Sequence, residues 1–442
     1  MTRRVTMDWV LFWTILILVA IGLVMVYSAS AIMLELKAAK PPVDAGWSLR
    51  RIAAAVLGIV GLVWLGWRYH NETISRGWLA VGIGWAAFVQ VTAYWMDTGA
   101  PHYAYAIKQV FTALVGFAAL MYISQRDYSR LRTSQWAFGS LGIVIVMLIA
   151  VYFLDPTQHR WFRLAGFSIQ PSELAKPTLV LFLAWFVTMR GDVNHRHTLW
   201  PAGLALVMLA GAVIVADFGT ALVLVATAAA IFFLAGLSRS YTLAAICVGT
   251  VLLAGAVVAK PYRLKRVIDF ADPDHKILAM FDSQNRLSEH LDRNSKVKDT
   301  NYQAEQAEIA FGAGGAWGRG IGNSRQKLLY LPAAHNDFIY AIVGEEMGLW
   351  GTLLLLTGFV VILWRGFRLY FTAPDDFGRY IAVGVTASLV FQAFLNMSVV
   401  VGLFPTKGIP LPLISYGGSS LIGSMISLGL LLGVSQRAIR TA

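Results

Sequence analysis

Apolar runs of about 20 residues recur along almost the whole chain, and this is the length that an α-helix needs to cross the hydrocarbon core of a bilayer. The chain is 57% hydrophobic and only 14% charged, whereas soluble domains carry roughly 25% charged residues. The sequence therefore predicts an all-α polytopic membrane protein, with residues 1–442 forming a single membrane domain.

Twelve apolar runs are predicted to span the membrane. They are roughly residues 9–32, 52–67, 78–96, 105–123, 135–154, 172–189, 198–216, 219–236, 241–259, 338–364, 378–402 and 415–435. With the N-terminus inside, the inner side receives Arg3, Arg4, Arg68, Arg76, Arg126, Arg130, Arg132, Arg190, Arg196, Arg239, Arg365, Arg368, Arg379, Arg437 and Arg440. The short outer loops receive fewer basic residues, among them Lys37, Lys40, Arg160, Arg163 and Lys407. Because basic residues favour the cytoplasmic side, both termini are predicted to be cytoplasmic.

Two segments interrupt the regular spacing of spans. Residues 33–104 hold the first outer loop plus a predicted extra helix pair. Residues 260–337 form a large extracytoplasmic loop between the ninth and tenth spans. Within it, 274–300 is polar and is predicted to be a mobile excursion or a surface helix, whereas 302–337 is rich in glycine and aromatics and is predicted to be ordered.

Composition also excludes several classes of protein. The single cysteine, Cys247, lies inside an apolar run, so neither an intramolecular disulfide nor redox chemistry is expected. The net charge of +12 is dispersed among the loops, which indicates membrane topology and anionic lipid headgroups and argues against nucleic acid. The first apolar run is too long for the core of a signal peptide, so it is predicted to be a retained span.

The dense polar motifs all fall at predicted outer helix ends. The first contains Arg160, Trp161 and Arg163 and leads into Glu173 and Lys176. Glu173 and Lys176 are three residues apart, so they share a helix face and can pair at membrane depth. Charges inside spans are costly, which favours a functional interpretation; a capped helix with a structural ion pair is the alternative.

Two shorter motifs follow. Asp217 lies in a turn between two spans, where it is either functional or a simple turn residue. Arg263 and Arg266 lie just beyond a span, where they either bind an anionic headgroup or only flank the helix.

The most informative motif ends the large loop, where glycine-rich residues 312–320 precede His335-Asn336-Asp337-Phe338 and Glu345-Glu346. Asp337 falls where an apolar run begins, near a predicted helix N-terminus. The helix dipole there favours the carboxylate, so it should not raise the pKa of Asp337. A low pKa suits a ligand for a metal ion or a donor hydroxyl better than it suits a base. The alternative is an N-cap aspartate.

The last motif contains Lys407 and Ser415 within a stretch that has three prolines in eight residues, Pro405, Pro410 and Pro412. Proline prevents a regular helix, and irregular backbone at membrane depth is tolerated where it is buried in protein or lines a wet cavity. Lys407 would offer an anion a point charge there.

Taken together, these motifs resemble the SEDS family (shape, elongation, division and sporulation) of peptidoglycan glycosyltransferases, which includes FtsW and RodA. The matching stretches occur in family order: 27–30, 160–161, 170–176, 217–221, 331–338 and the final proline-rich and Ser-Tyr-Gly-Gly-Ser-Ser segment. Residues 405–408 with 344–346 are more similar to FtsW than to RodA. The chain departs from the family in its extra helix pair, since the family usually has ten spans, in the insert at 274–300, and in Asn336 where the family usually has threonine.

The resemblance implies an enzyme of the bacterial cytoplasmic membrane that polymerises lipid II on the outer face, for septal synthesis. Asp337 would be the catalytic residue, deprotonating the acceptor 4-hydroxyl, with Mg²⁺ or Mn²⁺ as a candidate cofactor bound by Asp337. The candidate substrate-binding residues are Arg160, Trp161, Arg163, Glu173, Lys176, Asp217, Arg263, Arg266, His335, Lys407 and Ser415. The expected partners are lipid II, the undecaprenyl-pyrophosphate-linked glycan, a cognate class B penicillin-binding protein and other divisome proteins.

Other functions remain open from the sequence. A lipid II flippase would perform no bond chemistry and would use Glu345, Glu346 and Lys176 along a translocation path, although the polar motifs gather on one side of the membrane. A structural divisome scaffold and an elongation-type RodA polymerase are further alternatives. His335 is the rival base, because the unperturbed pKa of histidine suits neutral pH.

Overall fold

The computed structural model describes residues 7–37, 104–156, 158–164, 167–272, 300–328, 330–331 and 334–438. The predicted extra helix pair, at 52–67 and 78–96, and nearly all of the insert at 274–300 lie outside the described residues.

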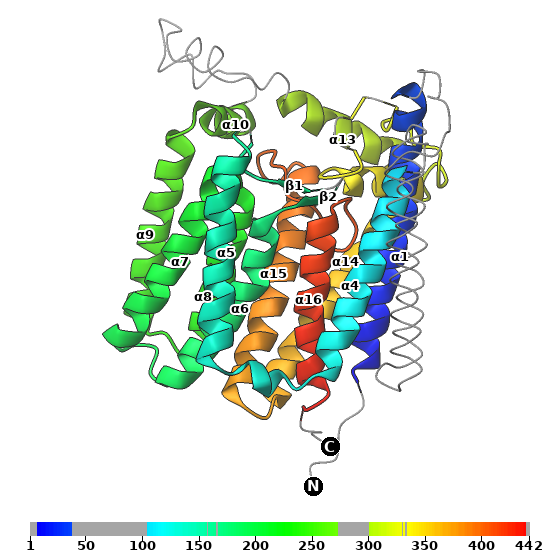
Figure 1. Ribbon diagram of the computed structural model, residues 1–442. Coiled ribbons are helices and arrows are strands. Elements are labelled where there is room, and N and C mark those ends of the chain that lie inside the picture. Colours follow the sequence, from blue (N-terminus) through cyan, green and yellow to red (C-terminus); the bar gives the residue numbers. More distant parts are fainter. Residues whose placement is uncertain are drawn as a thin grey trace, which may run out of the picture.

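The described chain is a bundle of long, nearly parallel helices (Figure 1). Its helices are α1 (Trp9–Lys37), α4 (Ala104–Gln125), the short 3₁₀ helix η1 (Tyr128–Leu131), α5 (Ser134–Leu154), α6 (Pro171–Arg190), α7 (Arg196–Ala216), α8 (Phe218–Leu234), α9 (Arg239–Val258), α10 (Pro261–Ala271), α13 (Thr300–Gly314), α14 (Ile339–Thr372), α15 (Asp376–Val400) and α16 (Gly418–Ser435). Two short strands, β1 (Phe162–Leu164) and β2 (Phe167–Ile169), complete the described elements.

Ten of the predicted spans correspond to helices in the described part of the chain. Nine of those helices are long and apolar enough to cross a membrane, and α8 is a shorter apolar helix. The boundaries agree with the predictions to within three residues, except that α1 and α14 extend further, to Lys37 and Thr372. The protein is therefore an integral membrane protein with several spans.

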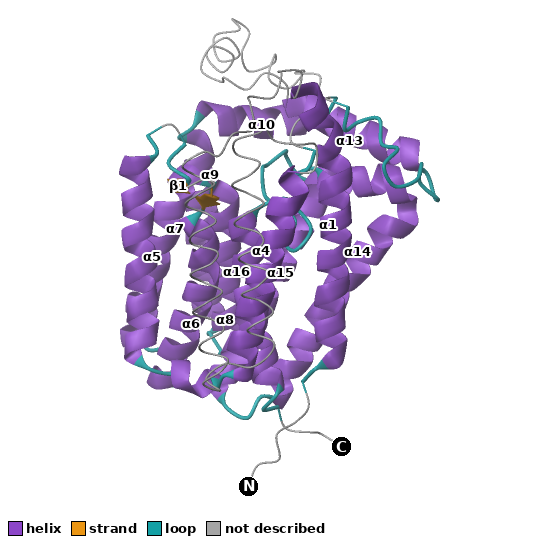
Figure 2. Cartoon of the chain, turned by 45° about the vertical axis from the view of Figure 1, so that its right-hand side comes forward, coloured by secondary structure: helices purple, strands orange, loops and turns teal. Residues whose placement is uncertain are grey.

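The bundle has two distinct ends. Helix α1 begins and α16 ends at one end, where the backbone N–H of Asp8 donates to Ser435 Oγ over 3.4 Å; we call it the terminal end. Helices α10 and α13 lie across the opposite end (Figures 1 and 2), which we call the loop end. The large loop predicted at 260–337 is thus partly helical.

The all-α class predicted from sequence is confirmed, and one short hairpin is the only strand structure in the described part of the chain. Strands β1 and β2 form a two-stranded antiparallel sheet in which Phe162 pairs with Ile169 and Arg163 with Ser168. This hairpin leads directly into α6, where Pro171 occupies the first turn as predicted. Proline is favoured there because the first N–H groups of a helix have no intrahelical acceptor.

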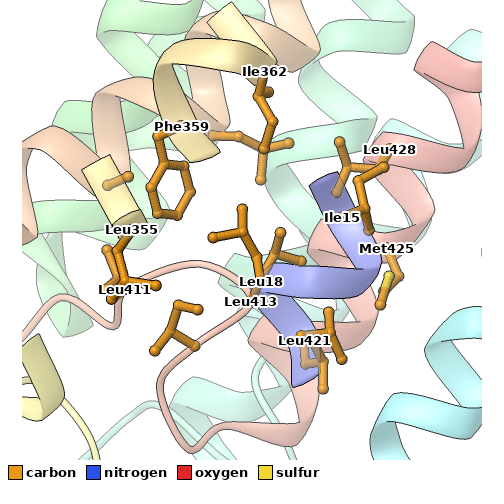
Figure 3. Close-up of a cluster of buried hydrophobic side chains, with 14 of the residues drawn as sticks. Ile15, Leu18, Leu355, Phe359, Ile362, Leu411, Leu413, Leu421, Met425 and Leu428 are labelled. Atoms are coloured by element: carbon orange, nitrogen blue, oxygen red, sulfur yellow. The ribbon is translucent and has the colours of Figure 1, made fainter. Parts of the chain in front are cut away.

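The proline-rich segment, which we define as residues 401–417, is exposed at Val401, Leu403 and Phe404 and is buried in the bundle from Leu411 to Ser415. Figure 3 shows Leu411 and Leu413 beside Leu18 of α1 and Phe359 of α14, and all four side chains belong to one buried apolar cluster. The segment touches α1 at Gly22, where an added Cβ would lie 2.6 Å from the carbonyl oxygen of Leu413. The absence of a side chain at this position allows irregular backbone to pack directly on a spanning helix.

Helix α14 is broken near the loop end. Gly348 has φ 67° and ψ −159°, a conformation that favours glycine. The N–H groups of Arg319 and Gly320 donate to the carbonyl oxygens of Glu345 and Glu346, each over 2.9 Å. The loop that follows α13 therefore supplies the hydrogen bonds that the helix loses at the break, as buried backbone groups require.

We expect Gly366→Ala to destabilise the bundle. An added Cβ at this position of α14 would overlap Thr386 Oγ1 and lie 2.8 Å from Thr386 Cβ on α15, and overpacking of this kind costs about 1–3 kcal/mol. Gly142 of α5 is exposed, with no atom within 4 Å of its would-be Cβ, so Gly142→Ala is the matched control. Thermal unfolding of the purified protein in detergent should show a lower midpoint for Gly366→Ala only; equal midpoints would contradict the packing of α14 on α15.

Candidate functional site

A cavity of about 300 Å³ opens at the loop end between α7, α8, α9 and α10. Five of the residues predicted from sequence line it, namely Arg160, Asp217, Arg263, Arg266 and Lys407. Four of these five are basic, and the fifth is an aspartate. The cavity is therefore suited to an anion with more than one negative charge.

Arg160 and Asp217 form the most firmly bonded pair of the cavity. Arg160 Nη2 lies 2.6 Å from Asp217 Oδ2. Asp217 is also the N-cap of α8, where its Oδ1 accepts hydrogen bonds from the N–H groups of Gly219 and Thr220. Burial raises the pKa of Asp217, but Arg160, Lys407 and the capping bonds outweigh burial, and the net pKa is lowered. Asp217 is thus a fixed anion that orients Arg160, not merely a turn residue.

Lys407 is the least satisfied cation of the cavity. Its Nζ lies 3.4 Å from the ring centroid of Phe218 and has no hydrogen-bond partner among the described residues. Burial lowers the pKa of this ammonium to about 6; Asp217 opposes the shift, and Arg263, Arg266 and Arg160 add to it. A buried lysine crowded by arginines is stabilised when an anion enters the cavity.

Asp337 lies against the strip of backbone that lines the cavity. Gly408 is part of the lining, and a Cβ at Gly408 would lie 2.6 Å from Asp337 Oδ2. The side chain of Asp337 is only partly exposed. The Asp337 carboxylate can therefore lie beside the cavity only because residue 408 has no side chain.

The low pKa expected for Asp337 is wrong, because burial outweighs any effect of the helix dipole. Helix α14 begins at Ile339 with Phe338 as its N-cap residue, which makes no side-chain capping bond, so Asp337 is not an N-cap. Burial raises the pKa of Asp337 to about 6, against the lowering effect of Arg160 and Arg266 and with a further raising effect from Asp217. A carboxylate with this pKa is a better base near neutral pH than an ordinary aspartate.

The two arginines of α10 differ in their contacts. Arg263 donates to the carbonyl oxygen of Ile214 over 2.7 Å and to that of Ala256 over 3.1 Å, so it fixes α10 to the ends of α7 and α9. Arg266 Nη1 donates to the carbonyl oxygen of Thr406 over 3.3 Å, while its Nε has no hydrogen-bond partner among the described residues. Arg266 therefore keeps a donor free for a ligand, whereas Arg263 is mainly structural.

Glu173 and Lys176 pair as predicted, with Lys176 Nζ 2.6 Å from Glu173 Oε2. Lys176 also donates to Gln392 Oε1 over 2.6 Å, and Gln392 Nε2 donates to the carbonyl oxygen of Pro410 over 2.8 Å. Both charged side chains are almost fully buried and lie outside the cavity lining. This chain of contacts ties α6 through α15 to the proline-rich segment.

The remaining predicted residues do not line the cavity. His335 packs between Tyr105 and Tyr416, with ring centroids 5.0 and 5.6 Å away. Ser415 Oγ donates to the carbonyl oxygen of Asn336 over 2.7 Å. Trp161, through its backbone, donates to Asp155 Oδ2 over 3.2 Å, and Arg163 is exposed on β1.

Glu345 and Glu346, which a lipid translocation path would use, form hydrogen bonds and ion pairs within the protein. Glu346 Oε1 lies 2.8 Å from Lys327 Nζ, and both are buried. Glu346 also accepts from Ser28 Oγ over 2.6 Å, and Glu345 accepts from Ser324 Oγ and from Arg319 Nη1, the latter over 3.3 Å. These contacts join the loop after α13 to α1 and α14, so they give the cluster a structural role.

Three residues shape the site although the sequence analysis gave them no site role. Phe218 lies under both Lys407 and Arg263, Gly408 makes room for Asp337, and Asn396 donates to the carbonyl oxygen of Asp337. The position of Phe218 next to Asp217 was the available signal. Nothing local in the sequence shows that Asn396, far from Asp337 in the chain, would reach it.

A divalent cation at Asp337 was expected from the sequence. No group of three or more His, Cys, Asp or Glu side chains with metal-binding geometry occurs among the described residues. Mg²⁺ commonly binds one or two carboxylates together with substrate phosphates. A single carboxylate, Asp337, beside a cavity suited to phosphate fits this arrangement.

Comparisons with known proteins agree on one family. Residues 73–439 match the model of the FtsW/RodA/SpoVE family, described as cell cycle proteins. The chain is 38% identical over 341 residues to a probable peptidoglycan glycosyltransferase FtsW of Geobacter sp. (strain M18), covering 75% of this chain and 86% of the relative. It is 34% identical over 370 residues to stage V sporulation protein E of Bacillus subtilis (strain 168), covering 81% and 94%.

Solved structures share the fold. One is a chain from a structure concerned with the coordination of polymerization and crosslinking by a peptidoglycan synthase complex. It superposes with a TM-score of 0.62 at 21% identity and covers 97% of this chain and 98% of the other. The bundle described above is therefore a known membrane fold.

We expect Asp337→Asn to stabilise the folded protein at neutral pH. Because the pKa of Asp337 is raised from 3.8 to about 6 on folding, ionisation opposes folding by about 1–3 kcal/mol above pH 6, and this effect is absent below about pH 4. The variant should therefore gain stability over the wild type as pH rises from 4 to 7. Chemical unfolding in detergent across this range measures the difference; a difference that does not change with pH would refute the raised pKa.

Proposed function

Since the chain belongs to the FtsW/RodA/SpoVE family of cell cycle proteins, we propose that it is a peptidoglycan glycosyltransferase that polymerises lipid II into glycan strands. The observation that carries this proposal is the juxtaposition of Asp337, whose pKa is raised to about 6, with a cavity lined by four basic side chains. A base beside an anion site is what the transfer of a sugar from a diphosphate carrier requires.

The role is in septal synthesis. The Geobacter relative at 38% identity is named FtsW, and the residues 344–346 and 405–408 have the FtsW-like pattern seen in the sequence. An elongation-type role is the alternative within the same chemistry.

The site faces outward from the bacterial cytoplasmic membrane. Arginines gather at the terminal end, at or near the ends of the spanning helices, among them Arg126, Arg190, Arg239 and Arg368. Basic residues near the membrane favour the cytoplasmic side, which supports an arrangement with both chain termini inside and the cavity at the outer surface. Lipid-linked substrate would then be used where the cell wall is built.

The reaction is an inverting glycosyl transfer in which Asp337 is the base. Its carboxylate accepts the proton of the acceptor GlcNAc 4-hydroxyl, and the oxygen attacks the anomeric carbon of the growing chain. The bond from that carbon to the diphosphate oxygen breaks, and the electron pair leaves with undecaprenyl pyrophosphate. His335 is a weaker candidate for the base, because it is buried between two tyrosines.

The cations of the cavity stabilise the leaving group. Lys407 Nζ and Arg266 Nε both lack hydrogen-bond partners among the described residues, so each can donate to a diphosphate oxygen. Arg160, held in place by Asp217 at 2.6 Å, adds a third positive charge. Fixed donors aimed at developing negative charge are often the largest contribution to catalysis.

A divalent cation, if bound, would be held by Asp337 and by diphosphate oxygens of the substrate. It would supply further neutralisation of the diphosphate charge. The surrounding arginines and Lys407 provide that neutralisation from the protein itself.

The proposed protein partners follow from the comparison with a solved structure. The chain shares its fold with a member of a complex that coordinates polymerization with crosslinking, which supports pairing with a crosslinking enzyme, a class B penicillin-binding protein. Other division proteins would join this pair.

We expect Asp337→Asn to lower the rate at which the purified protein, with its cognate partner, polymerises lipid II. The decrease should be a factor of about 10² or more. In the wild type, the pH profile of kcat/KM should be bell-shaped with its maximum near pH 6, because Asp337 must be ionised and Lys407 protonated, and the pKa of each is about 6. Gel analysis of the glycan product, with and without Mg²⁺ or Mn²⁺, measures both effects. Asp376→Asn, at an exposed aspartate of α15, is the control; glycan made normally by Asp337→Asn would refute the assignment of the base.

A further inference from the structure

One amide side chain joins the residue proposed as base to the wall of the cavity. Asn396, on the last turns of α15, is 1% exposed. Its Nδ2 donates to the carbonyl oxygen of Asp337 over 2.7 Å and to that of Ile409 over 2.6 Å. Ile409 follows Gly408, the residue that leaves room for the Asp337 carboxylate.

The contacts fix which way this amide points. Both partners are carbonyl oxygens, so only the NH₂ group can face them. The opposite atom, Asn396 Oδ1, is buried without a hydrogen-bond partner among the described residues. An unsatisfied buried acceptor is unfavourable, so the amide is poorly explained by local stability alone. What it provides is a fixed distance between two irregular backbone segments.

We propose that Asn396 is a positioning residue that sets the place of Asp337 relative to Gly408 and the cavity. This inference rests on the proposed function, in which Asp337 is the base. The Oδ2 atom of Asp337 lies only 2.6 Å from where a Cβ of Gly408 would be, so the carboxylate has little free space on that side. Small shifts of the Asp337 backbone would therefore move the carboxylate out of the geometry needed for attack.

A second contact keeps the region folded when Asn396 is changed. Ser415 Oγ donates to the carbonyl oxygen of Asn336 over 2.7 Å and accepts from the N–H of Leu411 over 2.7 Å. The segment before α14 thus remains attached to the proline-rich segment through Asn336. Loss of Asn396 should misplace Asp337 without detaching the whole segment.

The same helix offers a matched control. Gln392 lies one turn before Asn396, is 2% exposed, and donates to the carbonyl oxygen of Pro410 over 2.8 Å. It also accepts from Lys176 over 2.6 Å, and none of its hydrogen bonds in the described part of the chain is to Asp337. Gln392→Ala therefore removes two buried hydrogen bonds, as Asn396→Ala does, while leaving the residue proposed as base untouched.

The test compares Asn396→Ala, Asn396→Asp and Gln392→Ala in purified protein with its cognate partner. For both Asn396 variants we expect kcat for lipid II polymerisation to fall by roughly 10- to 100-fold, with KM changed by less than about twofold. Gln392→Ala should lower the unfolding midpoint about as much as Asn396→Ala while retaining kcat within about threefold. Equal kcat losses in Asn396→Ala and Gln392→Ala would overturn the proposal.

A second readout does not depend on catalysis. Carbodiimide labelling of Asp337, followed by mass spectrometry across pH 4 to 8, reports the ionisation of this carboxyl group. Asn396→Ala should shift the labelling midpoint by more than about half a pH unit, whereas Gln392→Ala should not. If the wild type made no glycan, the proposed function would fail, and an unshifted midpoint in Asn396→Ala would separately refute the positioning role.

Discussion

The fold depends on hydrogen-bond partners for the N–H and C=O groups of irregular backbone inside an apolar bundle. In lipid, each unpaired N–H or C=O group is costly, yet the proline-rich segment has little regular helix and is buried from Leu411 to Ser415. Amides on α15 supply part of what is missing, because Gln392 and Asn396 donate to the carbonyl oxygens of Pro410 and Ile409. The broken helix α14 is completed in a similar way by the N–H groups of Arg319 and Gly320.

The buried charged residues fall into two groups, according to whether they have partners within the protein. Lys176 and Lys327 have direct carboxylate partners, Glu173 and Glu346, at 2.6 and 2.8 Å, and they hold irregular segments against the helices. The donors around the cavity are less well matched, since Lys407 Nζ packs only on an aromatic ring and has no hydrogen-bond partner among the described residues. Binding energy for an anion is therefore concentrated at the cavity, beside Asp337.

Sequence patterns predicted the helices well because apolar length is a local property. The spans and the Glu173–Lys176 pair follow from hydrophobic runs and from i, i+3 spacing. Five lining residues were also anticipated, because charges at the ends of spans are unusual enough to be noticed.

What sequence could not give was the arrangement of segments distant in the chain. The raised pKa of Asp337 arises from burial, which only the packing of the proline-rich segment reveals. The contacts of Asn396 with Asp337, and of Lys176 with Gln392, join elements that no local pattern connects. Position at a predicted helix start was a poor guide to the electrostatics of Asp337, because the helix begins two residues later and the side chain turns to Gly408 instead.

The most direct test of the central claim, a diphosphate site beside Asp337, is the affinity of the purified protein for farnesyl diphosphate, a short polyprenyl diphosphate. Calorimetry in nanodiscs would compare wild type with Lys407→Met, and with Lys108→Met at an exposed lysine of α4 as control. Loss of a charge-assisted contact should weaken binding about tenfold or more in Lys407→Met and leave Lys108→Met unchanged. Unchanged affinity in a folded Lys407→Met protein would contradict the account.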